Sequence, residues 1–109
     1  MIFEIMNITF IIMFISIAFL FKKYYPKEIN PVVGYRTRRS MKSQEAWIIA
    51  NSYSSDLLYR QTIILLIIQI ILYFMYGGLV ALLGMLGIWI LMLVSTIILT
   101  ESFLKKSGF

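Results

Sequence analysis

Residues 62–100 read TIILLIIQIILYFMYGGLVALLGMLGIWILMLVSTIILT, and this stretch decides the fold. Two long apolar runs without a charged residue flank the pair Gly77 and Gly78. A bilayer-spanning helix needs about 20 mostly apolar residues, and paired glycines mark turns. Since only helices or closed barrels satisfy their backbone groups in lipid, the stretch predicts an antiparallel transmembrane hairpin.

A further apolar run, Ile5–Phe21, lies near the N-terminus. The preceding residues lack the basic region of a signal peptide, and no small-residue cleavage site follows, so we expect a retained span. The sequence therefore predicts an all-α membrane protein. Its single domain, residues 1–109, has three transmembrane helices at about 5–21, 58–76 and 79–100, with a basic cytoplasmic loop at about 22–57.

The composition supports an integral membrane protein. Hydrophobic residues make up 61% of the chain and charged residues 14%, whereas soluble domains average about 45–50% and about 25%. The chain contains neither cysteine nor histidine, which excludes thiolate chemistry and removes the commonest general base. We expect no enzyme activity, catalytic residue, metal ion or cofactor.

The placement of charge predicts the orientation. Of ten basic residues, eight lie between Lys22 and Arg60 and two follow the third span. Because basic residues concentrate on the cytoplasmic side, the loop and the C-terminus are expected in the cytoplasm, and the N-terminus and glycine turn on the outer side of the bacterial cell membrane. An excess of basic residues in such a protein points to topology and anionic headgroups, and nucleic acid is not an expected partner.

The second half of the loop predicts a helix. Ser43 is a good N-cap, and the acidic Glu45 suits the first turn of the helix that follows. This helix, at about residues 44–60, either lies in the membrane interface or continues directly into the second span. The sequence does not distinguish these alternatives.

Residues 30–51 read NPVVGYRTRRSMKSQEAWIIAN and contain several uncommon residue types at fixed offsets. The pattern of Asn-Pro, Gly-Tyr-Arg-Thr, Ser-Met, and Trp followed by Ala-Asn resembles the SdpI family of bacterial membrane proteins. The resemblance implies immunity to a secreted peptide toxin and, in some members, sequestration of a repressor at the membrane. Its candidate partner- or lipid-binding residues are Asn30, Pro31, Gly34, Tyr35, Arg36, Thr37, Arg38, Arg39, Ser40, Met41, Trp47 and Asn51.

The residues of this motif also have direct physical interpretations. Asn30 before a proline predicts a turn or an extended entry, and Gly34 allows a positive φ or a close backbone approach. Guanidinium groups of three arginines, with neighbouring hydroxyls, can bind a lipid phosphate or an acidic peptide terminus. Alternatively, the arginines are topology determinants on lipid phosphates. We favour this for Arg38 and Arg39, and a specific partner for Arg36.

Helical spacing places Trp47, Asn51 and Ser54 on one face. We favour a packing face with Trp47 anchored at the membrane interface. The alternative is a polar cavity in which Asn51 and Ser54 meet Arg36.

Charged residues near the helix ends are expected to pair. Asp56 and Arg60, four residues apart, predict an ion pair along the helix. Glu101 ends the third span, where it is either solvated or neutralised by Lys22, Lys23 or Arg60.

Two features predict contacts between helices. Gln69 falls near mid-membrane, where an unpaired amide is costly, so we expect a hydrogen bond to another helix of this chain or of a second copy. Gly77, Ala81, Gly84 and Gly87 form a smooth face, which we expect to pack against the second span. A homo-oligomer interface is the alternative.

The leading functional hypothesis is non-enzymatic protection against a membrane-active peptide toxin. The alternatives are a membrane scaffold or signalling protein that sequesters a cytoplasmic regulator, and a small oligomeric transporter. The lipid bilayer is an expected partner in each case.

Overall fold

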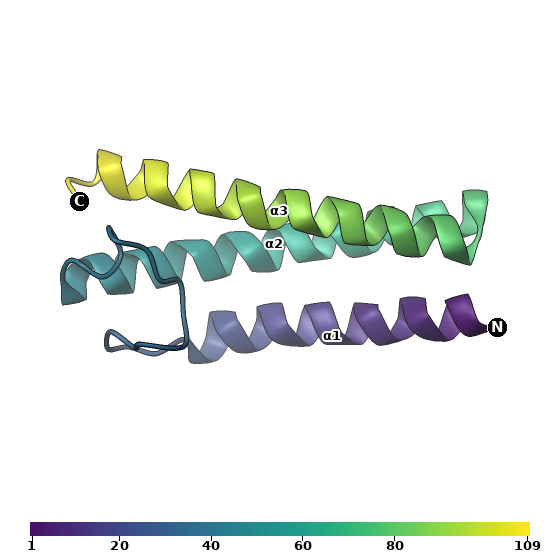
Figure 1. Cartoon of the computed structure of the whole chain (residues 1–109), viewed down its shortest axis with the longest axis horizontal. Helices are drawn as coiled ribbons and strands as arrows, with labels where there is room; N and C mark the ends of the chain where they lie inside the picture. The colour runs from purple at the N-terminus through teal and green to yellow at the C-terminus, as the bar shows by residue number, and fades with distance from the viewer.

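The computed structural model describes residues 1–109 as three helices lying side by side, α1 (Ile2–Tyr24), α2 (Gln44–Tyr76) and α3 (Gly78–Lys106), with α2 antiparallel to the other two (Figure 1). The rod that they form measures 48 × 23 × 17 Å. All three helices are long and apolar enough to cross a membrane. The predicted all-helical architecture with three candidate spans is confirmed.

The helix that begins at Gln44 continues without a break into the second span. α2 is 33 residues long, and its N-cap is Ser43, whose side chain accepts a hydrogen bond from the backbone N–H of Ala46 at 3.1 Å. This decides between the two alternatives in favour of a continuous helix. The irregular part of the loop is therefore residues 25–43, and α2 contains the helix predicted at about residues 44–60.

A single residue, Gly77, separates α2 from α3. Its φ of +92° lies in a region that side chains disfavour. The Gly77 N–H donates to the carbonyl of Tyr73 at 2.9 Å, and its own carbonyl accepts from Ala81 at 3.1 Å. The hairpin is confirmed with a tighter turn than predicted, because Gly78 already belongs to α3.

Apolar side chains from all three helices form the core. Phe14 of α1 stacks on Trp89 of α3, with ring centroids 4.5 Å apart. Buried beside them are Leu65, Leu82, Met85 and Met92. Most other large apolar side chains point outward, as expected for surfaces that contact lipid.

The small residues of α3 bring the helices close together near the turn. A Cβ on Gly84 would lie 3.0 Å from Leu72 of α2, and one on Gly78 would lie 2.9 Å from Phe3 of α1. The predicted packing against the second span is therefore confirmed at Gly84, whereas Gly78 lies outside the predicted face and packs against α1. No atom lies within 4 Å of the corresponding position on Gly87, where contact with a second copy stays a prediction.

Two amides connect the helices near the turn. The side chain of Gln69 is buried, and its Nε2 donates to Asn7 Oδ1 at 2.7 Å. Asn7 Nδ2 in turn donates to the carbonyls of Phe3 at 2.6 Å and Gly78 at 2.9 Å. The predicted interhelix hydrogen bond of Gln69 is confirmed, and the cluster includes atoms of α1, α2 and α3.

Candidate functional site

The loop of residues 25–43 folds against the N-terminal end of α2 and reaches the C-terminal end of α3 (Figure 1). Trp47 anchors its first part, because the indole N–H donates to the Pro26 carbonyl at 2.7 Å. The Trp47 side chain is fully buried. Its placement at the lipid interface is therefore wrong, since the loop covers the ring, whereas the predicted packing face of α2 is confirmed.

Gly34 fits against this face as no other residue would. Its φ is +111°, and a Cβ there would lie 2.8 Å from Asn51 Oδ1 and 2.9 Å from the Trp47 ring. Asn51 is fully buried, and its Oδ1 accepts a hydrogen bond from the Tyr35 N–H at 2.8 Å. The positive φ and the close approach predicted for Gly34 are both confirmed.

Asn30 and Pro31 form the turn that precedes Gly34. The side-chain oxygen of Asn30 accepts hydrogen bonds from the backbone N–H groups of Val32 at 2.8 Å and Val33 at 2.9 Å. This confirms the predicted turn and explains the pair in physical terms: the asparagine replaces a backbone acceptor while the proline restricts the chain.

A second turn follows at residues 37–41. The Thr37 N–H donates to Ser40 Oγ at 2.8 Å, the Ser40 N–H donates to Thr37 Oγ1 at 3.2 Å, and the Met41 N–H donates to the Thr37 carbonyl at 3.0 Å. Ser40 Oγ also donates to the Tyr35 carbonyl at 3.0 Å. Because Ser40 is fully buried, these hydroxyls stabilise the loop instead of facing a ligand pocket.

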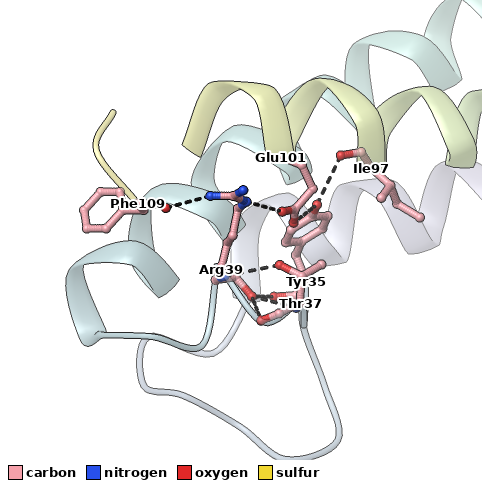
Figure 2. Close-up of polar contacts among 7 residues, drawn as sticks. Tyr35, Thr37, Arg39, Ile97, Glu101 and Phe109 are labelled. Carbon is pink, nitrogen blue, oxygen red and sulfur yellow. Dashed lines mark hydrogen bonds and ion pairs between the residues drawn. The ribbon is translucent and has the colours of Figure 1, made fainter. Parts of the chain in front are cut away.

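Tyr35, Arg39 and Glu101 join the loop to α3 (Figure 2). The Tyr35 hydroxyl donates to Glu101 Oε1 at 2.8 Å, and Arg39 Nε lies 3.4 Å from Glu101 Oε2. Arg39 also donates to the Phe109 backbone oxygen at 2.9 Å. We call Tyr35, Arg39 and Glu101 the loop clasp.

The loop clasp corrects the predicted neutralisation of Glu101. Lys22 lies 3.2 Å and Arg60 3.0 Å from Asp56. The predicted Asp56–Arg60 pair is confirmed, but Glu101 pairs with a loop arginine instead of Lys22, Lys23 or Arg60. Helical spacing could not reveal this contact, because it depends on the path of the loop back across α3.

The environment of Tyr35 favours its neutral form. Burial first, and then the adjacent carboxylate of Glu101, raise the pKa of Tyr35 above its usual value near 10. The phenol therefore remains a hydrogen-bond donor to Glu101 at physiological pH. This hydrogen bond therefore helps to hold the loop against α3.

The three arginines have different environments. Arg39 belongs to the loop clasp, whereas the exposed Arg36 and Arg38 have no hydrogen-bond or ion-pair partner in the chain. Asn51 and Ser54 are fully buried, so the structure does not bring them together with Arg36 in a polar cavity. The site is thus a folded loop that presents two free guanidinium groups.

Sequence reasoning missed two contributors to this region. Pro26 supplies the carbonyl that binds Trp47, and Phe103 stacks on Tyr53 with ring centroids 4.3 Å apart. Neither position has a local sequence signal for its partner. No group of acidic side chains is arranged to hold a metal ion.

Comparisons with known proteins match the region that contains this loop. The model of the SdpI/YfhL protein family matches residues 27–100. YfhL of Bacillus subtilis, an uncharacterized protein, is 56% identical over 39 residues, which span 36% of this chain and 36% of that protein. No solved structure matches the chain.

Proposed function

This chain belongs to the SdpI/YfhL protein family, and from that premise we propose that it protects a bacterial cell against a secreted, membrane-active peptide toxin without catalysing a reaction. The chain is a multi-pass membrane protein by its three apolar helices and its family. The observation that supports this function best is the loop, which is held to both α2 and α3 and leaves Arg36 and Arg38 free.

The free arginines suggest how recognition works. A guanidinium group binds a carboxylate or a phosphate through two parallel hydrogen bonds. Arg36 and Arg38 contact either an acidic group of the toxin or the lipid headgroup that the toxin would use. Because the loop is already ordered, little conformational entropy is lost on binding.

Under this proposal the motif residues divide into two groups. Arg36 and Arg38 contact the partner, and the others give the loop its shape. The shaping residues are Asn30, Pro31, Gly34, Tyr35, Thr37, Arg39, Ser40, Met41, Trp47 and Asn51.

Basic residues also define the proposed orientation. The loop and the C-terminal end of α3 are cytoplasmic, and the Gly77 turn and the N-terminus lie outside. In this orientation the toxin meets Arg36 only after it has entered the bilayer.

The alternative is a scaffold that holds a soluble regulator at the membrane. It is favoured by the same exposed basic residues, Arg36, Arg38 and Lys42. An acidic protein surface would complement them. The helix face at Gly87, which no other helix of this chain covers, would allow an immunity protein or a scaffold to work as a homo-oligomer.

A survival assay tests the proposal. A susceptible bacterium expressing the chain is challenged with secreted toxin peptides, alongside Arg36→Ala and, as a matched control, Lys42→Ala, which removes an exposed charge outside the Gly-Tyr-Arg-Thr segment. We expect protection by the wild type and the control and its loss with Arg36→Ala. A wild-type chain that reaches the membrane and gives no protection at any expression level would refute immunity.

The same strains test the scaffold. Membrane retention of a candidate regulator that depends on Arg36, with survival unchanged by the toxin, would favour that alternative.

A further inference from the structure

A groove beside the loop has an amphipathic lining. Its volume is about 610 Å³, and it lies between the end of α1, the start of the loop, α2 and Phe103 of α3. One wall is apolar, formed by Ile48, Ile49 and the stacked rings of Tyr53 and Phe103. The groove contains none of the motif arginines and is separate from the site proposed above.

Two lysines give the groove a positive charge. Lys22 and Lys27 line it together with one acidic residue, Asp56. Asp56 already has two cationic partners, Lys22 at 3.2 Å and Arg60 at 3.0 Å. The local balance is therefore positive, and the hydroxyl of Ser52 adds a hydrogen-bond donor to the lining.

Lys27 is positioned by its backbone neighbours. The Pro26 carbonyl accepts from Trp47 at 2.7 Å, and the Lys27 carbonyl accepts from the side-chain amide of Gln44. The Lys27 ammonium lies 3.4 Å from the centroid of the Tyr25 ring and makes no ion pair with an acidic residue. An ammonium without an acidic partner is available to form a charge-assisted hydrogen bond with an anion.

The position of the groove along the bundle matches that of a lipid headgroup. Lys22 and Lys23 follow the apolar run of α1 directly, and such residues mark the level of the phosphates. A second groove of about 290 Å³ shares Lys22 and is lined by Phe19, one turn closer to the centre of the membrane. Phe19 and its neighbour Leu20 are about half exposed, at 47% and 51%.

We infer that these grooves bind one anionic phospholipid. Its phosphate lies between Lys22 and Lys27, its headgroup hydroxyls face Ser52 and Asp56, and an acyl chain runs past Phe19. Charge complementarity selects a net negative headgroup over a zwitterionic one. The apolar wall and the adjoining groove favour a lipid over a free phosphate.

The test compares lipids of equal chain length on the full chain in a non-ionic detergent. Native mass spectrometry gives apparent Kd values for phosphatidylglycerol and phosphatidylcholine. We expect phosphatidylglycerol to bind about tenfold more tightly, and Lys27→Gln to weaken it about fivefold. Lys27→Arg should restore the affinity, and the matched control Lys106→Gln, which also removes one exposed charge, should change it less than about twofold.

Three outcomes would overturn the inference. Equal loss with Lys27→Gln and Lys106→Gln would indicate non-specific attraction to a basic protein. Equal affinity for both lipids in the wild type would exclude selection by charge. Displacement of the lipid by millimolar glycerol phosphate would assign the groove to a soluble anion. Because Lys27 makes no ion pair within the chain, unfolding is not expected to obscure its substitution, and a melting curve of each variant verifies this.

Discussion

Two of the polar clusters that join the helices lie toward opposite ends of the bundle, and they differ in charge and surroundings. The amides of Asn7 and Gln69 meet Gly78 close to the turn and are neutral, with both side chains almost completely buried. The loop clasp at the other end contains a carboxylate and a guanidinium, whose side chains are 28% and 36% exposed. Burying an unpaired charge in lipid is far more costly than burying a paired amide. The amide cluster thus satisfies its buried groups with neutral hydrogen bonds, whereas the loop clasp pairs its charges where the side chains are partly exposed.

The largest expected effect on stability comes from adding a side chain at Gly34, where the loop packs closely against α2. Gly34→Ala places a Cβ 2.8 Å from Asn51 Oδ1 and 2.9 Å from the Trp47 ring at a φ of +111°. Backbone strain and overpacking together should lower the free energy of unfolding by about 2–4 kcal/mol. Titration with a denaturing detergent, followed by tryptophan fluorescence, measures it.

Gly87→Ala is the matched control, because no atom of another helix lies within 4 Å of its new Cβ. It should change the unfolding free energy by less than about 1 kcal/mol. Equal losses of unfolding free energy in Gly34→Ala and Gly87→Ala would show that the close packing of Gly34 does not hold the loop in place.

Substitutions in the amide cluster of Asn7 and Gln69 should have the next largest effect on the free energy of unfolding. Gln69→Leu leaves Asn7 Oδ1 without its donor and should cost about 1–2 kcal/mol, as measured for hydrogen bonds between membrane helices. The double variant Asn7→Leu/Gln69→Leu also removes the hydrogen bond to the Gly78 carbonyl, so its loss should exceed that of Gln69→Leu but stay below the sum of the two single losses. Losses that simply add would contradict the coupling of the two amides.

A smaller effect is expected from the phenol of the loop clasp. Tyr35→Phe removes the 2.8 Å hydrogen bond to Glu101 and should lower the unfolding free energy by about 1 kcal/mol. Tyr24→Phe, at a 64% exposed residue, is the control and should have no measurable effect.

The same variant should alter the response to alkaline pH. Because the pKa of Tyr35 is raised in the folded chain, the unfolded chain loses this proton first. The stabilisation is fully present below the ordinary tyrosine pKa of about 10 and is lost as the pH rises above it. The wild type should therefore lose more stability than Tyr35→Phe between neutral pH and about pH 11. If the unfolding free energies of the wild type and Tyr35→Phe fell equally with rising pH, the raised pKa of Tyr35 in the folded chain would be refuted.

A labelling experiment with no expected effect on stability determines which cluster faces the cytoplasm. The chain has no cysteine, so single cysteines can be placed at Val32, which is 78% exposed, and Tyr76, which is 62% exposed. We expect an impermeant thiol reagent to label Tyr76→Cys in intact cells and Val32→Cys only after permeabilisation. The reverse pattern would invert the proposed orientation.

The features that sequence reasoning predicted depend on local rules. Hydropathy located three spans, the cap at Ser43 followed from helix chemistry, and Gly34 followed from its missing side chain. The need of Gln69 for a partner followed from the cost of a lone amide in lipid, although Asn7 could not be named.

The features that escaped prediction depend on the path of the loop. The burial of Trp47 and the pairing of Glu101 with Arg39 arise because residues 25–43 fold back across two helices. Neither a hydropathy window nor a helical spacing contains that information. The continuity of α2 was left open for a related reason, since its polar first half is compatible with either environment.

The turn at Gly77 limits how the molecule can move. With one residue between α2 and α3, the two helices cannot slide along each other, so their relative motion is a rotation about that point. Such a rotation separates them most at the far end, where Tyr35 and Arg39, carried by the loop on α2, hold Glu101 of α3. A partner that competes for Glu101 would therefore act at the end of α3 farthest from this pivot, where a given rotation displaces the helices most.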